Sequence, residues 1–218
     1  MKINLHRSNF FYLLCSLIIY PVFISIAPEN PHGYFWLSVL FSFIIIFCLL
    51  AIVHRRYFLI SIMIIGALAL ISHWMVYLLH PGFYFYIILY VTNILFLIII
   101  TAFILYTITT HRQITEDSLF GAICGYFLIG FIWSSIYLLI ATINPGAFSQ
   151  PMITPFIHLS AQRAFYFSFT TMTTLGYGDV LPVSHMAKTC SWLEAVIGQI
   201  YLAVWISQLV GLRIAQKR

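Results

Sequence analysis

The sequence predicts an all-α membrane protein with six transmembrane helices and one short re-entrant helix between the fifth and sixth. Of its 218 residues, 62% are hydrophobic and 7% are charged, whereas a soluble domain carries about a quarter charged residues. The apolar residues gather in blocks of about 20 or more, the length that a helix needs to cross a hydrocarbon core of about 30 Å. These blocks are apolar on every side, and barrel strands would instead alternate apolar with polar residues.

Six blocks are long enough to span a membrane, and turn-forming or basic residues separate them. We expect spanning helices over Phe10–Ala27, Tyr34–Val53, Tyr57–Leu79, Phe83–Thr109, Leu119–Ile143 and Met186–Leu212. The first block could be mistaken for a secretory signal, but its length and the Pro28 that directly follows Ala27 predict a retained helix. We divide the chain into a four-helix region of unknown role, residues 1–117, and a second region, residues 118–218.

The basic residues indicate how the helices are oriented. Eight of the ten Lys and Arg residues lie at every second boundary between blocks: Lys2, Arg7, Arg55, Arg56, Arg112, Arg213, Lys217 and Arg218. Because positive charge marks the cytoplasmic side of short loops, we expect a multi-pass protein of the cell membrane with both termini in the cytoplasm. The basic residues form no continuous face, which excludes nucleic acid as a partner. The four cysteines lack metal-ligand spacing and are expected to be apolar fillers.

The connection between the fifth and sixth blocks is longer than the others and has its own order. After a proline-containing entry, Ser160 is a candidate helix N-cap, and an apolar and aromatic run follows over residues 161–173. About 13 residues are too few to span a membrane, so we expect a re-entrant helix. A Gly-Tyr-Gly segment comes next, and non-helical backbone at membrane depth is tolerated where it lines a water-filled path. This order predicts a pore, and we expect residues 118–218 to be the pore domain, made of an outer helix, the short pore helix, the ion filter and an inner helix.

Residues 171–179 read Thr-Met-Thr-Thr-Leu-Gly-Tyr-Gly-Asp, which resembles the filter motif Thr-Val-Gly-Tyr-Gly-Asp of the potassium channel family. Leu175 is a conservative departure from the usual Val or Ile. The overall pattern is similar to a bacterial six-helix channel. The resemblance implies passive K⁺ conduction through a tetrameric pore, with K⁺ at the filter as the metal and no cofactor. Its partners would be other copies of the chain, membrane lipid and K⁺.

The chemistry of the motif can also be argued from the residues themselves. Stripping water from K⁺ requires rings of replacement oxygens, which backbone carbonyls supply. We expect the carbonyls of five residues to coordinate the ion: Thr174, Leu175, Gly176, Tyr177 and Gly178. Consecutive carbonyls face one axis when alternate residues adopt left-handed dihedrals, which glycine allows. One such strand cannot enclose an ion and the chain holds one motif, so four copies must assemble.

Several neighbouring residues are candidates to support the filter. We expect Tyr177 to point away from the ions, toward aromatic residues such as Tyr166 and Phe167. Asp179 stands where the family places an acid at the outer mouth of the filter. The family's usual carboxylate partner is replaced here by Thr170, so a bond to Asp179 would be weaker or would use Tyr166.

Three further residues stand out because their type is unusual for their position. Glu194 is an ionisable residue in a spanning helix and must have a partner; we expect hydroxyls of the re-entrant helix such as those of Thr170 or Thr171, and leave open that it is protonated. Gly198 matches the family position of a hinge, and close helix packing is the equal alternative. Arg163 lies near the start of the re-entrant helix, where we favour interfacial anchoring over a role in gating.

Other classes of function fit less well. The fourth block has no Lys or Arg, so we expect weak voltage dependence. An enzyme would need paired acids, a nucleophile with its base or a ligand cluster, and the few acids are dispersed. Two alternatives stay open, a weakly selective cation channel and a non-conducting modulatory subunit. The gating stimulus cannot be read from the sequence.

Overall fold

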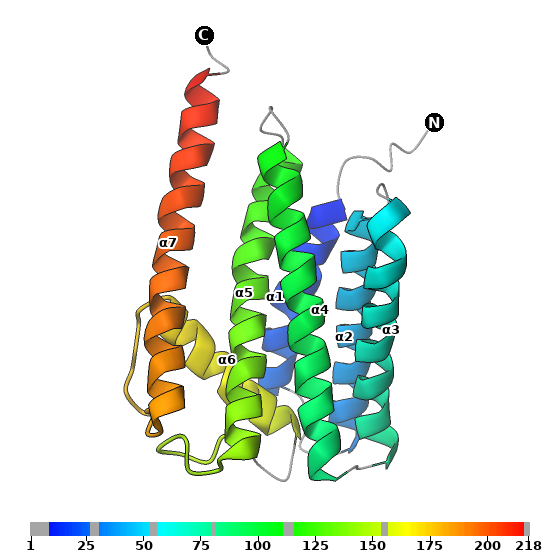
Figure 1. Ribbon diagram of the computed structural model, residues 1–218, viewed down its shortest axis with the longest axis vertical. Coiled ribbons are helices and arrows are strands. Elements are labelled where there is room, and N and C mark those ends of the chain that lie inside the picture. The colour runs from blue at the N-terminus through cyan, green and yellow to red at the C-terminus, as the bar shows by residue number, and fades with distance from the viewer. Residues whose placement is uncertain are drawn as a thin grey trace.

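A computed structural model describes residues 9–26, 31–52, 56–79, 82–110, 116–153 and 157–215, which form seven α-helices and no strand (Figure 1). The helices are α1 (Asn9–Ile26), α2 (Pro31–Ile52), α3 (Arg56–Leu79), α4 (Phe83–Thr110), α5 (Glu116–Ile143), α6 (Ile157–Met172) and α7 (His185–Ala215). Six of them match the six expected long helices to within three residues at each end. The seventh, α6, lies where the sequence predicts the short helix.

Six long helices stand side by side as a bundle, and α6 lies tilted in its lower half (Figure 1). The first residues of α1 and the last residues of α7 lie at the same end of the bundle, the upper end in Figure 1. The side chains of all eight basic residues used for the orientation argument lie outside the described residues, so the cytoplasmic placement of the termini stays a prediction. The division at residue 117 stays a prediction as well.

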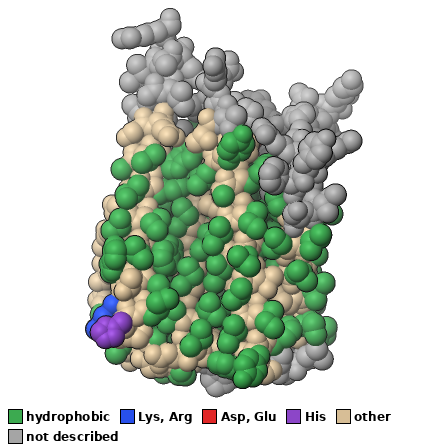
Figure 2. Space-filling view, in the orientation of Figure 1, with side chains coloured by type: hydrophobic (Ala, Val, Ile, Leu, Met, Phe, Trp, Pro, Cys, Tyr) green, Lys and Arg blue, Asp and Glu red, His purple; other side chains and the backbone are tan. Residues whose placement is uncertain are grey.

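The described surface is that of a membrane protein. Two helical stretches are long and apolar enough to cross a bilayer, Phe83–Thr109 and Asp117–Ile143, and α1, α2 and α3 contain shorter apolar stretches. The face in Figure 2 is covered by hydrophobic side chains, and its charged and histidine side chains gather at one spot at the lower left. Water would not stabilise such a surface, whereas lipid tails would.

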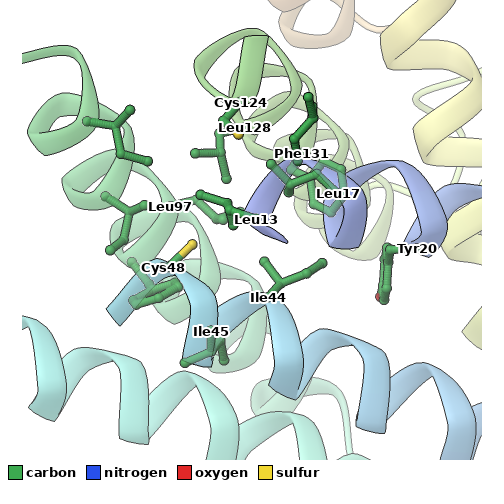
Figure 3. Packing of buried hydrophobic residues seen from close by; sticks show 14 of the residues in the cluster. Leu13, Leu17, Tyr20, Ile44, Ile45, Cys48, Leu97, Cys124, Leu128 and Phe131 are labelled. Carbon is green, nitrogen blue, oxygen red and sulfur yellow. The ribbon is translucent and has the colours of Figure 1, made fainter. Parts of the chain in front are cut away.

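The main core lies between α1, α2, α4 and α5 (Figure 3). Leu13 and Leu17 of α1 and Ile44 of α2 are fully buried there, and Phe131 of α5 lies beside them. A second cluster around Tyr137 and Phe167 joins α5 to α6. The sequence does not fix which side of each helix faces these cores, because the helices are apolar all round.

Helix α7 stands apart from the first four helices and packs on α5 and α6 (Figure 1). The hydroxyl of Tyr201 donates to the carbonyl of Ala122 on α5 over 2.5 Å. The opposite side of α7 carries an exposed apolar stripe at intervals of four residues: Trp192, Val196, Ile200 and Val204. One side of α7 is therefore packed within the chain, and the stripe is left uncovered in the single chain.

Candidate functional site

The site begins with α6, which starts earlier than the sequence predicts. Ser160 is not the N-cap, because the helix includes Ile157 and places Ser160 about one turn inside it, with its side chain buried. The helix is 16 residues long, or about 24 Å at 1.5 Å per residue, which is shorter than a hydrocarbon core. Arg163 lies in its second turn, and the guanidinium donates a hydrogen bond to the carbonyl of Pro151.

The segment after α6 has an alternating backbone. Thr174, Gly176 and Gly178 have φ angles of 60°, 51° and 82°. They are the described residues in the left-handed region, and they occur at every second position. Left-handed dihedrals at Gly176 and Gly178 are the geometry expected from the sequence. When left-handed and right-handed backbone dihedrals alternate, successive carbonyls turn toward the same side. The result is a row of oxygens along one strand.

The carbonyl of Thr170 anchors the beginning of this segment. It accepts hydrogen bonds from the backbone N–H groups of Leu175 and Gly176, at 2.9 and 3.1 Å. The N–H of Thr174 donates to the carbonyl of Thr171 at 2.9 Å. The segment therefore continues from the last turn of α6, and the partial negative charge of the helix C-terminus lies beside it. Residues 173–179 are exposed in the single chain.

Aromatic packing braces the outward side of the segment. The ring of Tyr177 stacks on that of Tyr166, with centroids 6.2 Å apart and planes 2° from parallel. The hydroxyl of Tyr166 lies near the carboxylate of Asp179 and interacts with it, which fits the second of the two arrangements considered for Asp179. Phe167 packs instead on Tyr137 and Phe148. It belongs to the core between α5 and α6, so the described ring contacts of Tyr177 are with Tyr166.

The loop before α6 and the chain after Asp179 are paired with each other, which the sequence does not predict. Phe148 and Pro182 form an isolated antiparallel bridge. The N–H of Ser149 donates to the carbonyl of Leu181 at 2.8 Å, and the N–H of Val183 donates to that of Ala147 at 2.8 Å. The side chain of Gln150 reaches the carbonyl of Asp179 at 3.0 Å. These contacts fix the chain just beyond Gly178.

Glu194 has partners, but they are not the expected threonines. The hydroxyl of Ser168 on α6 lies 2.5 Å from Oε1 of Glu194, and the hydroxyl of Tyr137 on α5 donates to Oε2 at 2.5 Å. The hydroxyl of Thr170 bonds back to the carbonyl of Tyr166 at 2.9 Å. Side chains two positions apart in a helix point in directions that differ by about 200°. Thr170 therefore points away from the side on which Ser168 meets α7.

The hydrogen bonds of Ser168 close a connection between three helices. Its hydroxyl also lies 2.9 Å from the carbonyl of Gly130 on α5. Ser168 therefore joins α5 to α7 through a buried polar group behind the filter segment. Glu194 is fully buried, and the only sequence signal for this network is an acid in a helix that would otherwise be apolar. Tyr137 and Ser168 give no signal of their own in the sequence.

Gly198 marks the point where α7 crosses the end of α6. A Cβ atom built there would lie 2.5 Å from Cγ of Met172 and 2.6 Å from its backbone carbonyl oxygen. Real Cβ atoms essentially never come that close to another heavy atom, so one of the two helices would have to shift. The geometry therefore supports close helix packing as the role of Gly198, because glycine lets the two backbones approach. Helix α7 is continuous through this position, and a hinge at Gly198 stays a prediction.

A short helix that ends at a row of backbone oxygens, held between two long apolar helices, is the arrangement of an ion channel pore. The family described as Ion channel matches residues 93–212, which is more than half of the chain. The chain belongs to this family, and the resemblance to potassium channels drawn from residues 171–179 is confirmed. The family points to transport rather than to enzymatic catalysis.

A curated relative supports the assignment over a short stretch. The chain is similar to the inward rectifier potassium channel Kirbac3.1 of Paramagnetospirillum magnetotacticum, with 49% identity over 41 residues. The aligned stretch is 19% of this chain and 14% of that protein, so most of each chain lies outside the alignment. No solved structure matches the chain.

Proposed function

We propose that the protein is a subunit of a homotetrameric, potassium-selective channel that conducts K⁺ passively across the cell membrane. The observation that carries the proposal is the alternating left-handed backbone at Thr174, Gly176 and Gly178. An ordinary turn after a helix needs one such residue, usually glycine. Three of them at alternate positions, one a threonine, are what a strand of ion-coordinating carbonyls requires.

The coordinating residues in this proposal are Thr174, Leu175, Gly176, Tyr177 and Gly178. Tyr166 and Asp179 hold the outer end of the filter, and Glu194 holds the helix behind it. The exposure of residues 173–179 in the single chain supports assembly, because a row of carbonyls encloses an ion only when other copies complete the ring. Four copies give the ring of oxygens that replaces the hydration shell of K⁺.

The six long helices of 18, 22, 24, 28, 28 and 31 residues cross the membrane in this proposal, since about 17–25 residues suffice. Helix α6 enters from the outer side and returns as the filter. The ends of α1 and α7 that lie together in Figure 1 are then on one side of the membrane, and the positive-inside rule makes that side the cytoplasm.

The test is selective flux in liposomes that contain the purified protein. Gly176→Ala places a side chain on a residue with φ of 51° and with no atom within 4 Å of the new Cβ, so the change strains the backbone by about 1–2 kcal/mol per copy. We expect wild-type liposomes to pass K⁺ and exclude Na⁺, and the variant to lose the K⁺ flux.

Gly82→Ala is the matched control. Its Cβ also meets nothing within 4 Å, and Gly82 does not have a positive φ, so its flux should equal that of the wild type. Equal passage of Na⁺ and K⁺ in the wild type would support a weakly selective cation channel. Absence of flux in wild-type liposomes with correctly assembled protein would support a non-conducting modulatory subunit.

A further inference from the structure

A cavity lies at the centre of the bundle, with a wall that is mostly apolar but includes several polar side chains. It has a volume of about 60 Å³, and its walls include Tyr20 of α1, His73 of α3, Asn93 of α4, Ser134 of α5 and Phe165 of α6. A cavity needs about 10–15 Å³ of such space to hold one water molecule, so this one has room for water. It is the place where the first four helices meet the beginning of the pore helix.

Asn93 supplies the first reason to expect an occupant. The residue is 8% exposed, and its side-chain oxygen Oδ1 is buried and accepts no hydrogen bond from the described protein. Buried polar atoms almost always have a partner, from the protein or from ordered water. Because Asn93 is part of the cavity wall, the missing donor is to be found inside the cavity.

The other polar residues of the wall are suited to an occupant that is small, uncharged and able to donate hydrogen bonds. Tyr20 and Tyr90 both line the cavity, and their hydroxyls are electrostatic neighbours. Ser134 and Ser135 contribute two more hydroxyl oxygens. The wall contains no carboxylate among its residues, which disfavours a cation, and an apolar occupant would leave Oδ1 of Asn93 without a donor. Water needs two to four polar partners, and this wall provides them.

We propose that the cavity binds a cluster of ordered water molecules anchored by Asn93. The cluster also touches the network behind the filter through Ser134. The hydroxyl of Ser134 donates to the carbonyl of Gly130 at 2.8 Å, and the same carbonyl lies 2.9 Å from the hydroxyl of Ser168. Polar residues of the first four helices then supply bound water beside the beginning of α6.

Hydroxyl-radical footprinting by X-ray radiolysis tests this proposal on the full chain in lipid nanodiscs. Radicals form where water is present, so a buried side chain is oxidised when ordered water lies beside it. We expect oxidation of Tyr20 and Tyr90, which are 5% and 7% exposed. Phe96, which is 1% exposed and does not line the cavity, should be protected. Protection of both tyrosines to the level of Phe96 would overturn the proposal, whether the cavity is dry or filled by a lipid or detergent chain.

Asn93→Leu tests the anchor, because it replaces the amide with an apolar group of similar size. We expect it to abolish the oxidation of Tyr90. The matched control is Thr101→Val on the same helix, whose buried hydroxyl bonds to its own backbone at Leu97, and it should leave the oxidation unchanged. If Tyr90 in the Asn93→Leu variant is oxidised as much as in the wild type, the proposal is contradicted. If that variant does not fold, Asn93→Ser keeps an oxygen and enlarges the cavity, so oxidation should rise, and a fall would be contrary evidence.

Discussion

The hydrogen bonds of Ser168 and Glu194 show how α6 is held between α5 and α7. The hydroxyl of Ser168 has one proton, but two acceptor oxygens lie within hydrogen-bond distance, those of Gly130 and Glu194. Both contacts become full hydrogen bonds when Ser168 donates to Gly130 and a protonated Glu194 donates to Ser168. A neutral carboxyl also suits a buried group for which the described structure shows no basic partner. Glu194 is then a neutral connector between α5, α6 and α7.

A pair of substitutions at Glu194 tests this connection. Glu194→Gln keeps a neutral side chain that can donate and accept, so we expect the thermal stability of the assembled protein to change little. Glu194→Leu leaves the buried hydroxyls of Tyr137 and Ser168 without this partner, which should destabilise the fold by about 1–3 kcal/mol. Thermal unfolding in detergent measures both. If Glu194→Gln is as destabilised as Glu194→Leu, the carboxyl is needed in its charged form.

Tyr166 offers a second prediction at this scale. Tyr166→Phe keeps the stacked ring against Tyr177 but removes the hydroxyl that interacts with Asp179. We expect the K⁺ to Na⁺ flux ratio to fall by about two- to fivefold, as for other exposed polar contacts with a charge. Tyr84→Phe, at an 80% exposed tyrosine, is the control and should leave the ratio unchanged. An unaltered ratio in Tyr166→Phe would show that the ring stack alone holds the outer mouth.

Among the elements, the crossing of α6 and α7 matters most for the filter. The last residue of α6, Met172, lies against Gly198, and the alternating backbone begins two residues later. Glu194 lies one turn before Gly198 and bonds to Ser168, which lies one turn before Met172. Two neighbouring turns of α7 therefore hold two neighbouring turns of α6. A shift of α7 moves the end of α6, and the filter segment begins there.

Gly198→Ala separates the two interpretations of this glycine. If close packing is its role, the new Cβ pushes against the backbone oxygen of Met172, and we expect a loss of about 1–3 kcal/mol in stability together with loss of selective flux. A hinge would instead leave the folded protein as stable as the wild type and reduce opening alone. Thermal unfolding and flux measured on the same preparation distinguish these outcomes. Gly146→Ala, with its Cβ 3.6 Å from Asn144, is the control.

At the scale of the whole molecule, the single chain leaves two features uncovered on its pore side. One is the filter segment, residues 173–179, and the other is the apolar stripe of α7 from Trp192 to Val204. The part of the chain that carries them, from the end of α6 to α7, lies on the other side of α5 from α2, α3 and α4 (Figure 1). Packing them against other copies would bring the stripe into van der Waals contact with a neighbouring helix and complete the ring of carbonyls.

The predicted assembly has a mass of four chains of 25.1 kDa, which native mass spectrometry in mild detergent measures directly. Ile200→Ser removes an apolar side chain from the stripe and should shift the protein toward smaller species, because the shorter side chain loses van der Waals contacts with the neighbouring copy. Ile98→Ser on α4, at a similarly exposed isoleucine, should leave the mass unchanged. A monomeric wild type would contradict the tetramer.

The sequence by itself determined the long helices, the short helix between the last two and the backbone of the filter. Block length sets the number of long apolar helices because a bilayer has a fixed thickness. The two glycines adopt left-handed dihedrals because other residues do so only at a steric cost. These are local properties, and the structure agrees with them at Gly176 and Gly178.

Only the tertiary structure decided which side chains meet. Helices that are apolar all round carry no pattern that fixes their rotation, so the sequence could not show that Glu194 meets Ser168 and Tyr137 instead of Thr170 or Thr171. It could not place Asn93 on a cavity wall either. The start of α6 at or before Ile157, the pairing of Phe148 with Pro182 and the fit of Gly198 on Met172 likewise depend on contacts between distant segments, which come from packing.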